Sequence, residues 1–270
     1  MRKAATLFLL LAAACVPEKK DETKPSETAA TVTAIAVAPT ETATAAPQAR
    51  KTEERTNTFE FDYSYPAEAA AIPALAAELE ADLAKQRREL VAAAREGQVA
   101  AKETGFPFNP YSYSAGWSVV ADLPGWLSLS AGASTYTGGA HPNHWSQALL
   151  WDKAAGQSRR ATDLFASRGA LAAAIREPFC QALNRERAAR RGEPIDPNSE
   201  DMFDQCIDPT ASTVILGSSN KQQFDRIGIL IAPYEAGPYA EGDYEVTLPV
   251  TKAVLAAVKP QYRSVFALGR

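Results

Sequence analysis

The order of hydrophobic and polar residues predicts strands and two long helical stretches after residue 57. Aromatic and polar residues alternate over residues 58–65, the pattern of a strand with one buried face. Pro66 ends this strand, and residues 67 to about 101 predict a helix whose leucines share one stripe. Pro73 fits its first turn, where a missing N–H costs little. A second helical region extends from residue 169 to about 191.

Several shorter runs add further strands. Residues 117–123 and 126–136 flank a Pro-Gly pair, which predicts an antiparallel hairpin. The other expected strands are 145–151, one that follows the turn at 152–157, 212–216, 224–231 and 244–248. Strands grouped with long helices predict an α+β fold with a mainly antiparallel sheet. One long N-terminal helix and further helices are expected to pack on that sheet.

The N-terminus has the pattern of an export signal. Two basic residues precede an uncharged, leucine-rich run from residue 4 to residue 14. This run is shorter than the roughly 20 residues of a membrane-spanning helix, and it fits a signal peptide. Leu11-Ala12-Ala13-Ala14-Cys15 resembles a lipobox, so residues 1–14 are expected to be removed and Cys15 to carry lipid. An ordinary signal peptide with an incidental cysteine is the alternative.

The segment after Cys15 predicts a tether. Residues 16–58 contain no aromatic residue and are rich in Thr, Ala, Pro, Glu and Lys. Such a sequence buries too little apolar surface to offset its ordering entropy, so residues 15–57 are expected to be a disordered, lipid-attached tether. The residue after Cys15 is Val16 and not aspartate, and in this the chain resembles lipoproteins sent to an outer membrane. The expected location is the cell envelope, on the periplasmic face of the outer membrane if the organism is Gram-negative.

Charge narrows the possible partners. The chain has 28 Lys and Arg against 32 Asp and Glu, and removing Arg2 and Lys3 with the signal peptide leaves 26 against 32, a net charge of −6. No dense basic run is present, so nucleic acid is not an expected partner. Membrane contact is expected through the lipid anchor only.

Cysteine usage agrees with export. With Cys15 lipidated, Cys180 and Cys206 form the remaining pair. In an oxidising compartment they are expected to form a disulfide that closes a loop of about 26 residues and contributes about 3 kcal/mol. Two buried free thiols are the alternative.

Two loops carry a family resemblance. Tyr136-Thr137-Gly138-Gly139-Ala140-His141-Pro142-Asn143 is followed downstream by Asp163-Leu164-Phe165. Residues 232–242, Ala-Pro-Tyr-Glu-Ala-Gly-Pro-Tyr-Ala-Glu-Gly, are followed by Tyr244-Glu245-Val246-Thr247-Leu248-Pro249. In this order they resemble the paired envelope domains beside the catalytic part of PdaC-type peptidoglycan deacetylases. The same pair resembles the extracellular region of the RsiV-type anti-sigma factor, which senses lysozyme.

The resemblance implies two domains and a binding role. It covers residues 58 to 249 approximately, with a PdaC-like domain at 58–151 and an RsiV-like domain at 152–270. The family's domains are non-catalytic where a function is known, and the metal motifs of the deacetylase's catalytic domain do not occur here. The expected ligand is peptidoglycan or a lysozyme-like protein. The resemblance and the loop chemistry place the ligand-binding residues at Tyr136, Gly138, Gly139, His141, Asn143, Tyr234, Glu235, Pro238 and Tyr239.

Histidine chemistry offers a rival hypothesis. His141 and His144 are the chain's only histidines, and their spacing of three could place both imidazoles on one metal ion if the segment were helical. The glycines and the proline around them favour a turn instead. An aspartate such as Asp122 or Asp163 would have to complete the ligands, and no metal site is therefore expected.

Hydrolytic chemistry finds equally little support. A serine hydrolase needs a nucleophile beside a histidine, and no Gly-x-Ser-x-Gly elbow is present. Glycan cleavage needs paired carboxylates, and acidic residues at turn ends are usually solvated. The candidates for these reactions are Ser128, Ser130 and Ser134, and the pair Glu235 and Glu241. No catalytic residue and no cofactor are expected, and the rival hypothesis is a hydrolase or metal-dependent envelope enzyme centred on His141.

Overall fold

The computed structural model describes residues 46–196 and 198–270. The expected signal peptide, Cys15 and the first part of the expected tether lie outside the described residues, so these expectations stay predictions. The tether was expected to continue to residue 57, whereas strand β1 occupies Arg50–Arg55. This strand has no apolar residue, so the hydrophobic pattern does not reveal it. It is held by pairing with β2. The chain from Ala45 to Arg270 forms one compact unit.

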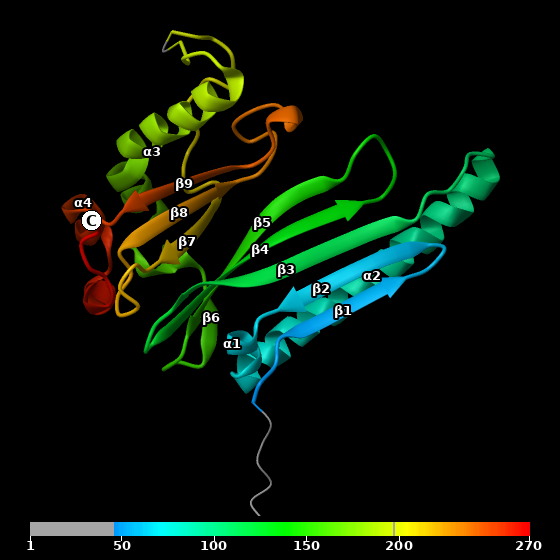
Figure 1. Cartoon of the computed structure of the whole chain (residues 1–270), viewed down its shortest axis with the longest axis horizontal. Helices are drawn as coiled ribbons and strands as arrows, with labels where there is room; N and C mark the ends of the chain where they lie inside the picture. Colours follow the sequence, from blue (N-terminus) through cyan, green and yellow to red (C-terminus); the bar gives the residue numbers. More distant parts are fainter. Residues whose placement is uncertain (1–45, 197) are drawn as a thin grey trace, which may run out of the picture. The chain divides into compact units, whose positions relative to one another are not determined.

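Six strands form the first sheet, in the order in which they occur along the chain (Figure 1). They are β1, β2 (Phe59–Tyr65), β3 (Tyr111–Asp122), β4 (Trp126–Tyr136), β5 (Asn143–Asp152) and β6 (Gln157–Arg159). Every neighbouring pair is antiparallel except β2 and β3, which are parallel. Parallel neighbours need a long crossover, and the helices α1 (Ala67–Ala70) and α2 (Pro73–Thr104) supply it.

Helix α2 lies across one face of this sheet (Figure 1). Pro73 stands in its first turn, and Gly105 ends it with φ of 72°. The predicted leucine stripe is its buried face, made of Leu75, Leu79, Leu83 and Leu90. These side chains pack with aromatic residues of β2 and β3, including Phe61 and Tyr113. The expected long N-terminal helix is therefore confirmed.

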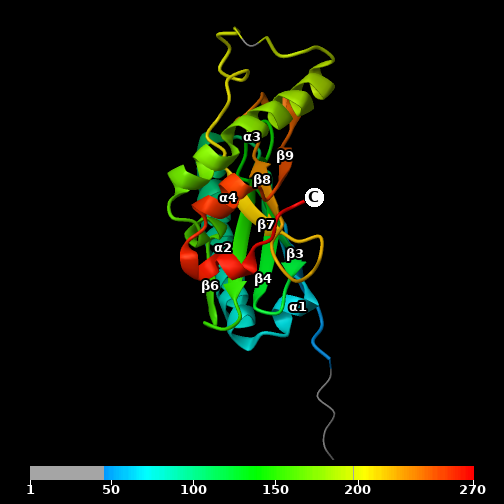
Figure 2. The same cartoon turned by 90° about the vertical axis from the view of Figure 1, so that its left-hand side faces the viewer.

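Three strands form the second sheet. They are β7 (Thr213–Gly217), β8 (Arg226–Ile231) and β9 (Tyr244–Pro249), all antiparallel, in the order β7-β8-β9. Helices α3 (Arg168–Arg191) and α4 (Lys252–Ala257) lie over this sheet (Figure 2). Short 3-10 helices complete the unit: η1 (Ala161–Leu164), η2 (Tyr239–Glu241) and η3 (Pro260–Val265). The fold is α+β and mainly antiparallel, as expected.

The core of the second sheet reaches into the first. Phe179 of α3 and Ile229 of β8 are buried in the same cluster as Trp126 of β4 and Leu150 of β5. Trp126 meets Phe224 and Tyr262 edge-on, with ring centroids 6.4 and 5.9 Å away. Residues on both sides of the expected boundary at 151 and 152 thus share one hydrophobic core. This shared core fixes the loops of one sheet relative to those of the other.

Candidate functional site

The two loops predicted to bind a ligand meet in space. The β4–β5 loop (residues 137–142) and the β8–β9 loop (residues 232–243) extend toward the same end of the two sheets (Figure 1). The ring of His141 stacks on Tyr239 with centroids 3.7 Å apart and planes 20° apart. Tyr234 completes the group, 5.6 Å from Tyr239 and 6.3 Å from His141 between centroids. We refer to His141, Tyr234 and Tyr239 as the aromatic surface.

Both ring nitrogens of His141 are engaged. Its Nδ1 lies 2.9 Å from the carbonyl oxygen of Pro142, which only accepts, so Nδ1 carries the hydrogen in this contact. The Nε2 atom lies 3.4 Å from the hydroxyl of Tyr234. The Tyr239 hydroxyl donates to the same Pro142 carbonyl at 3.0 Å. His141 therefore joins the two loops.

Backbone geometry explains why these sequences form these loops. Gly138 and Gly139 have φ of 94° and 104°, a region that residues with a side chain rarely adopt. The Tyr136 hydroxyl donates to the Gly139 carbonyl at 3.1 Å and closes the turn. In the other loop Tyr234 has φ of 70° and leaves 55% of its surface exposed. A large residue held in this conformation marks a backbone that its surroundings determine.

The remaining predicted residues lie at the margin. Asn143 is exposed at the first position of β5, paired with Thr135. Pro238 is exposed directly before Tyr239. The carboxylate of Glu235 accepts a hydrogen bond from the Ser212 hydroxyl at 2.6 Å. The fold thus brings the rings together and directs Glu235 to a partner at the start of β7.

A cavity of about 270 Å³ adjoins the aromatic surface. It lies between the first sheet and the β8–β9 loop, and His144 on its wall lies 6.1 Å from Tyr239 between ring centroids. Its polar lining includes Ser114, Ser134, Ser146 and Asp243, and its apolar lining includes Trp145 and Pro233. Apart from the hydrolase candidate Ser134 and the metal candidate His144, the sequence interpretation missed this lining, because the residues come from β3, β4, β5 and a loop that only the tertiary fold assembles.

A buried arginine supports the β8–β9 loop from behind. Arg187 of α3 has no exposed surface, and its Nε donates to the Ala236 carbonyl at 2.9 Å. The same guanidinium donates to the carbonyls of Gln205 and Asp204 at 3.1 and 3.3 Å. Burial lowers the pKa of Arg187 from its ordinary value. No signal in the sequence identified it, since an arginine in a polar helical stretch is usually solvated.

Arg191, one turn further along α3, adds an ion-pair network. It contacts Glu241 at 2.8 Å and Asp204 at 2.5 Å, and all three side chains are largely buried. Tyr244 also donates to Glu241. Burial alone would raise the pKa of Glu241, but the hydrogen bonds from Arg191 and Tyr244 outweigh it and hold that pKa below its usual value. Glu241 is therefore a fixed, ionised partner of α3.

The predicted disulfide is confirmed. Cys180 of α3 is bonded to Cys206, with Cα atoms 5.4 Å apart. Cys206 follows Asp204 and Gln205, whose carbonyls hold Arg187. The disulfide therefore fixes the segment whose carbonyls bind Arg187. Arg187 in turn holds the β8–β9 loop through Ala236.

The two aspartates considered as metal ligands have other partners. Asp122 pairs with Lys153 at 2.5 Å, and Asp163 pairs with Arg160 at 2.9 Å. Within residues 46–196 and 198–270 no three His, Cys, Asp or Glu side chains are grouped to hold a metal ion. No helix in this part of the chain is long and apolar enough to cross a membrane. The enzyme hypothesis centred on His141 stays an untested alternative.

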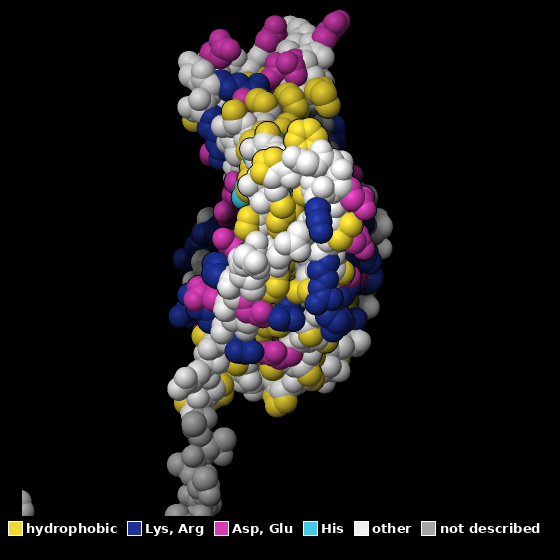
Figure 3. Space-filling view, turned by 90° about the vertical axis from the view of Figure 1, so that its right-hand side faces the viewer, with side chains coloured by type: hydrophobic (Ala, Val, Ile, Leu, Met, Phe, Trp, Pro, Cys, Tyr) yellow, Lys and Arg dark blue, Asp and Glu magenta, His cyan; other side chains and the backbone are white. Residues whose placement is uncertain are grey.

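Apolar side chains are also exposed at the far end of α2. Val99 near its end is 57% exposed, and Phe106, two residues after it, is 74% exposed. Figure 3 shows this side of the unit, where hydrophobic side chains gather on the upper half and lysines and arginines lie below them. Phe106 belongs to neither loop, so it provides an exposed aromatic side chain outside the candidate site.

One comparison with known protein families matches part of the chain. Residues 52–144 match the family model described as deacetylase PdaC. The expected PdaC-type resemblance is confirmed for these residues, and it supports an envelope-associated protein. The RsiV-like pairing stays a prediction.

Solved structures and curated proteins add two results. The chain is similar to a crystal structure of a DUF3298 family member from Bacteroides fragilis, with 16% identity, coverage of 75% of this chain and 90% of that chain, and a TM-score of 0.48. It is also similar to a DUF3298 family protein from Pseudomonas aeruginosa, with 16% identity, coverage of 82% and 97%, and a TM-score of 0.45. No curated protein matches the chain.

Proposed function

We propose that this protein is a non-catalytic binding module of the cell envelope that recognises peptidoglycan or a lysozyme-like protein through the aromatic surface. The observation that carries the proposal is the stack of His141 on Tyr239, with Tyr234 beside it, built from loops about 90 residues apart in the sequence. The match of residues 52–144 to the deacetylase PdaC model supports an envelope role.

The chemistry of the aromatic surface suits recognition. Tyrosine rings offer flat apolar faces with a polar edge, and such side chains contribute much of the energy at binding sites. The cavity beside the rings adds hydroxyl groups and the carboxylate of Asp243, which could orient a polar ligand. The β8–β9 loop is tied to α3 before a ligand arrives, which lowers the entropy lost on binding.

The proposed location follows from the N-terminal sequence. A lipidated Cys15 would hold the protein at a membrane without a spanning segment, and the tether would let the binding module reach ligands away from the lipid surface. Membrane attachment in this proposal is through the lipid only.

Calorimetry with the full chain tests the proposal. Soluble peptidoglycan fragments and lysozyme are titrated separately into the wild type, Tyr239→Ala and Phe106→Ala. We expect saturable binding of one of these ligands, weakened about tenfold by Tyr239→Ala because a central aromatic contact is lost. Phe106→Ala is the matched control, since it removes an exposed aromatic ring elsewhere. Tyr239→Phe keeps the stacking ring and loses only the hydrogen bond to Pro142, so it should retain most of the affinity.

Two outcomes would contradict the proposal. One is that neither ligand gives heat, and the other is that Tyr239→Ala and Phe106→Ala lose equal affinity.

A further inference from the structure

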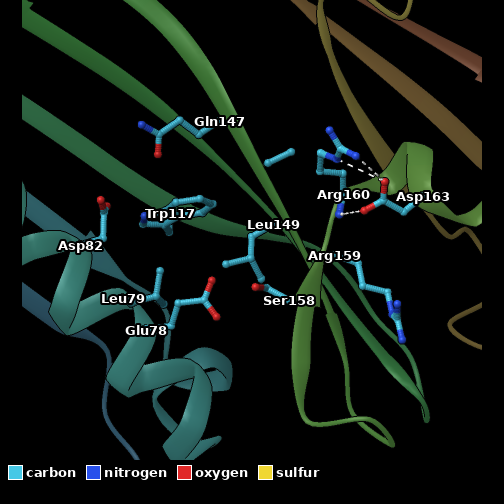
Figure 4. A pocket seen from close by; sticks show the side chains of 11 residues that line it. Glu78, Leu79, Asp82, Trp117, Gln147, Leu149, Ser158, Arg159, Arg160 and Asp163 are labelled. Atoms are coloured by element: carbon cyan, nitrogen blue, oxygen red, sulfur yellow. Dashed lines mark hydrogen bonds and ion pairs between the residues drawn. The ribbon is translucent and has the colours of Figure 1, made fainter. Parts of the chain in front are cut away.

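An open groove of about 610 Å³ lies between α2 and the segment formed by β5, β6 and η1 (Figure 4). Its volume is within the range of small-molecule sites. The groove shares no residue with the aromatic surface or with the cavity beside it. Its floor is apolar, made by the buried side chains of Leu79, Leu149 and Trp117.

The α2 wall of the groove carries two carboxylates without a basic partner. Glu78 and Asp82 are four residues apart, so they lie on the same side of the helix. Glu78 points toward Leu149 and Ser158 (Figure 4), and no ion pair or hydrogen bond of its carboxylate occurs in the described part of the chain. Asp82 accepts hydrogen bonds from Tyr63 at 2.8 Å and Gln86 at 3.1 Å, both uncharged.

The opposite wall does not neutralise these carboxylates. Arg160 makes two hydrogen bonds to one oxygen of Asp163, at 2.9 and 3.1 Å, so its charge is matched locally. Arg159 points away from α2 in Figure 4 and pairs with Asp152 at 3.0 Å. The groove therefore has an uncompensated negative charge on the α2 side, which favours a cationic group.

Uncharged polar groups complete the lining. Gln147 is half-buried and Ser158 is exposed, and both side chains line the groove. Tyr113 lies behind this lining, only 5% exposed, with the side chain of Gln147 beside its hydroxyl. Burial, together with the nearby charge of Asp82, raises the pKa of Tyr113 to about 12. The amide of Gln147 and the hydroxyl of Ser158 can each donate and accept hydrogen bonds, so they can bind a ligand with polar groups.

We propose that this groove binds a glycan that carries a free primary amino group. The ammonium group lies between the carboxylates of Glu78 and Asp82, where charge-assisted hydrogen bonds are strongest. The hydroxyl groups of the sugar bond to Ser158 and Gln147, and its apolar ring face lies on the floor made by Leu149 and Trp117. An anionic ligand would face the unpaired carboxylates, and a purely apolar one would leave the polar lining unsatisfied.

Calorimetry with the full chain and three probes tests this assignment. The probes are a β-1,4-linked glucosamine tetramer, its fully N-acetylated counterpart and 1,4-diaminobutane. We expect the glucosamine tetramer to bind at least about tenfold more tightly than the other two, since only it combines ammonium and hydroxyl groups. Equal binding of the acetylated tetramer would overturn the role of the ammonium group, and equal binding of diaminobutane would overturn the role of the sugar.

Variants on one helix locate the site. Glu78→Gln should weaken binding of the glucosamine tetramer about tenfold, and its exposed position makes loss of folding a small concern. Glu96→Gln is the matched control, an exposed glutamate on α2 outside the groove, and it should change the affinity by less than about twofold. Phe106→Ala, which changes an exposed aromatic residue outside both sites, should also leave this binding unchanged. Wild-type affinity in Glu78→Gln would refute the proposal.

Discussion

The two loops of the aromatic surface are stabilised in different ways. The β4–β5 loop is a turn whose shape comes from its own backbone, with positive φ at Gly138 and Gly139 and one hydrogen bond from Tyr136. The β8–β9 loop receives support from another element, because Arg187 and Arg191 of α3 bond to Ala236 and Glu241. One half of the surface is self-supporting, and the other is braced from behind.

This difference assigns a role to each half. The β8–β9 loop presents Tyr234 and Tyr239 from a backbone tied to α3 and, through the disulfide, to the segment before β7. The β4–β5 loop brings His141 onto Tyr239 and is otherwise exposed from residue 137 to residue 140. A ligand would therefore meet fixed tyrosines on one side and a more adaptable histidine turn on the other.

Replacing Arg187 has the largest expected effect on this comparison. Arg187→Met removes the buried guanidinium and leaves the carbonyls of Ala236, Asp204 and Gln205 without their partner. We expect the free energy of unfolding to fall by about 4 kcal/mol, since each unsatisfied buried group is costly. Denaturant unfolding measures this loss.

Hydrogen exchange tests whether the effect of Arg187→Met is confined to the β8–β9 loop. Amides of residues 232–243 should exchange faster under native conditions, whereas those of residues 137–142 should keep their rates. Arg185→Met is the matched control, because Arg185 is an exposed arginine on the same helix. Equal acceleration in both loops would mean that Arg187 does not brace the β8–β9 loop selectively.

Removing the disulfide is expected to have the next largest effect. The bond between Cys180 and Cys206 spans 26 residues, and its loss should lower the unfolding free energy by about 3 kcal/mol. Because Cys206 adjoins the carbonyls that hold Arg187, native-state exchange should again rise in residues 198–206 and 232–243. Adding reductant to the Cys180→Ser and Cys206→Ser double variant controls for effects unrelated to this bond. A melting temperature that reductant leaves unchanged in the wild type would contradict the expectation.

The sequence predicted the parts of the fold that local patterns determine. The alternation at residues 58–65 became β2, the leucine stripe became the buried face of α2, and the Pro-Gly pair joins β3 to β4. The two loops were identified by their glycines and tyrosines, and they do meet. The β3–β4 hairpin differs from a simple hairpin in one respect, because its pairing register shifts between Val119 and Ala121.

Features that depend on distant partners could not be predicted. Strand β1 has only polar residues and forms because β2 offers an edge to pair with. Arg187 is an arginine in a polar helix pattern, and only the folded chain places three carbonyls around it. The groove at Glu78 joins elements from residue 78 to residue 163, which no local spacing connects.

The smallest expected effect tests the self-supporting loop. Gly139→Ala places a side chain at φ of 104°, so we expect the unfolding free energy to fall by about 1 kcal/mol from local strain. Gly116→Ala is the matched control, because Gly116 is exposed in β3 outside the cavity, has no positive φ, and would place its added Cβ 3.7 Å from the Ser64 hydroxyl, so alanine there should be neutral or slightly stabilising. Binding to the aromatic surface should weaken in Gly139→Ala alone, because His141 would lose its position on Tyr239. If Gly139→Ala instead matched Gly116→Ala in both stability and affinity, the positive φ of the turn would not be what positions His141, and the contact with Tyr239 itself would have to hold the β4–β5 loop.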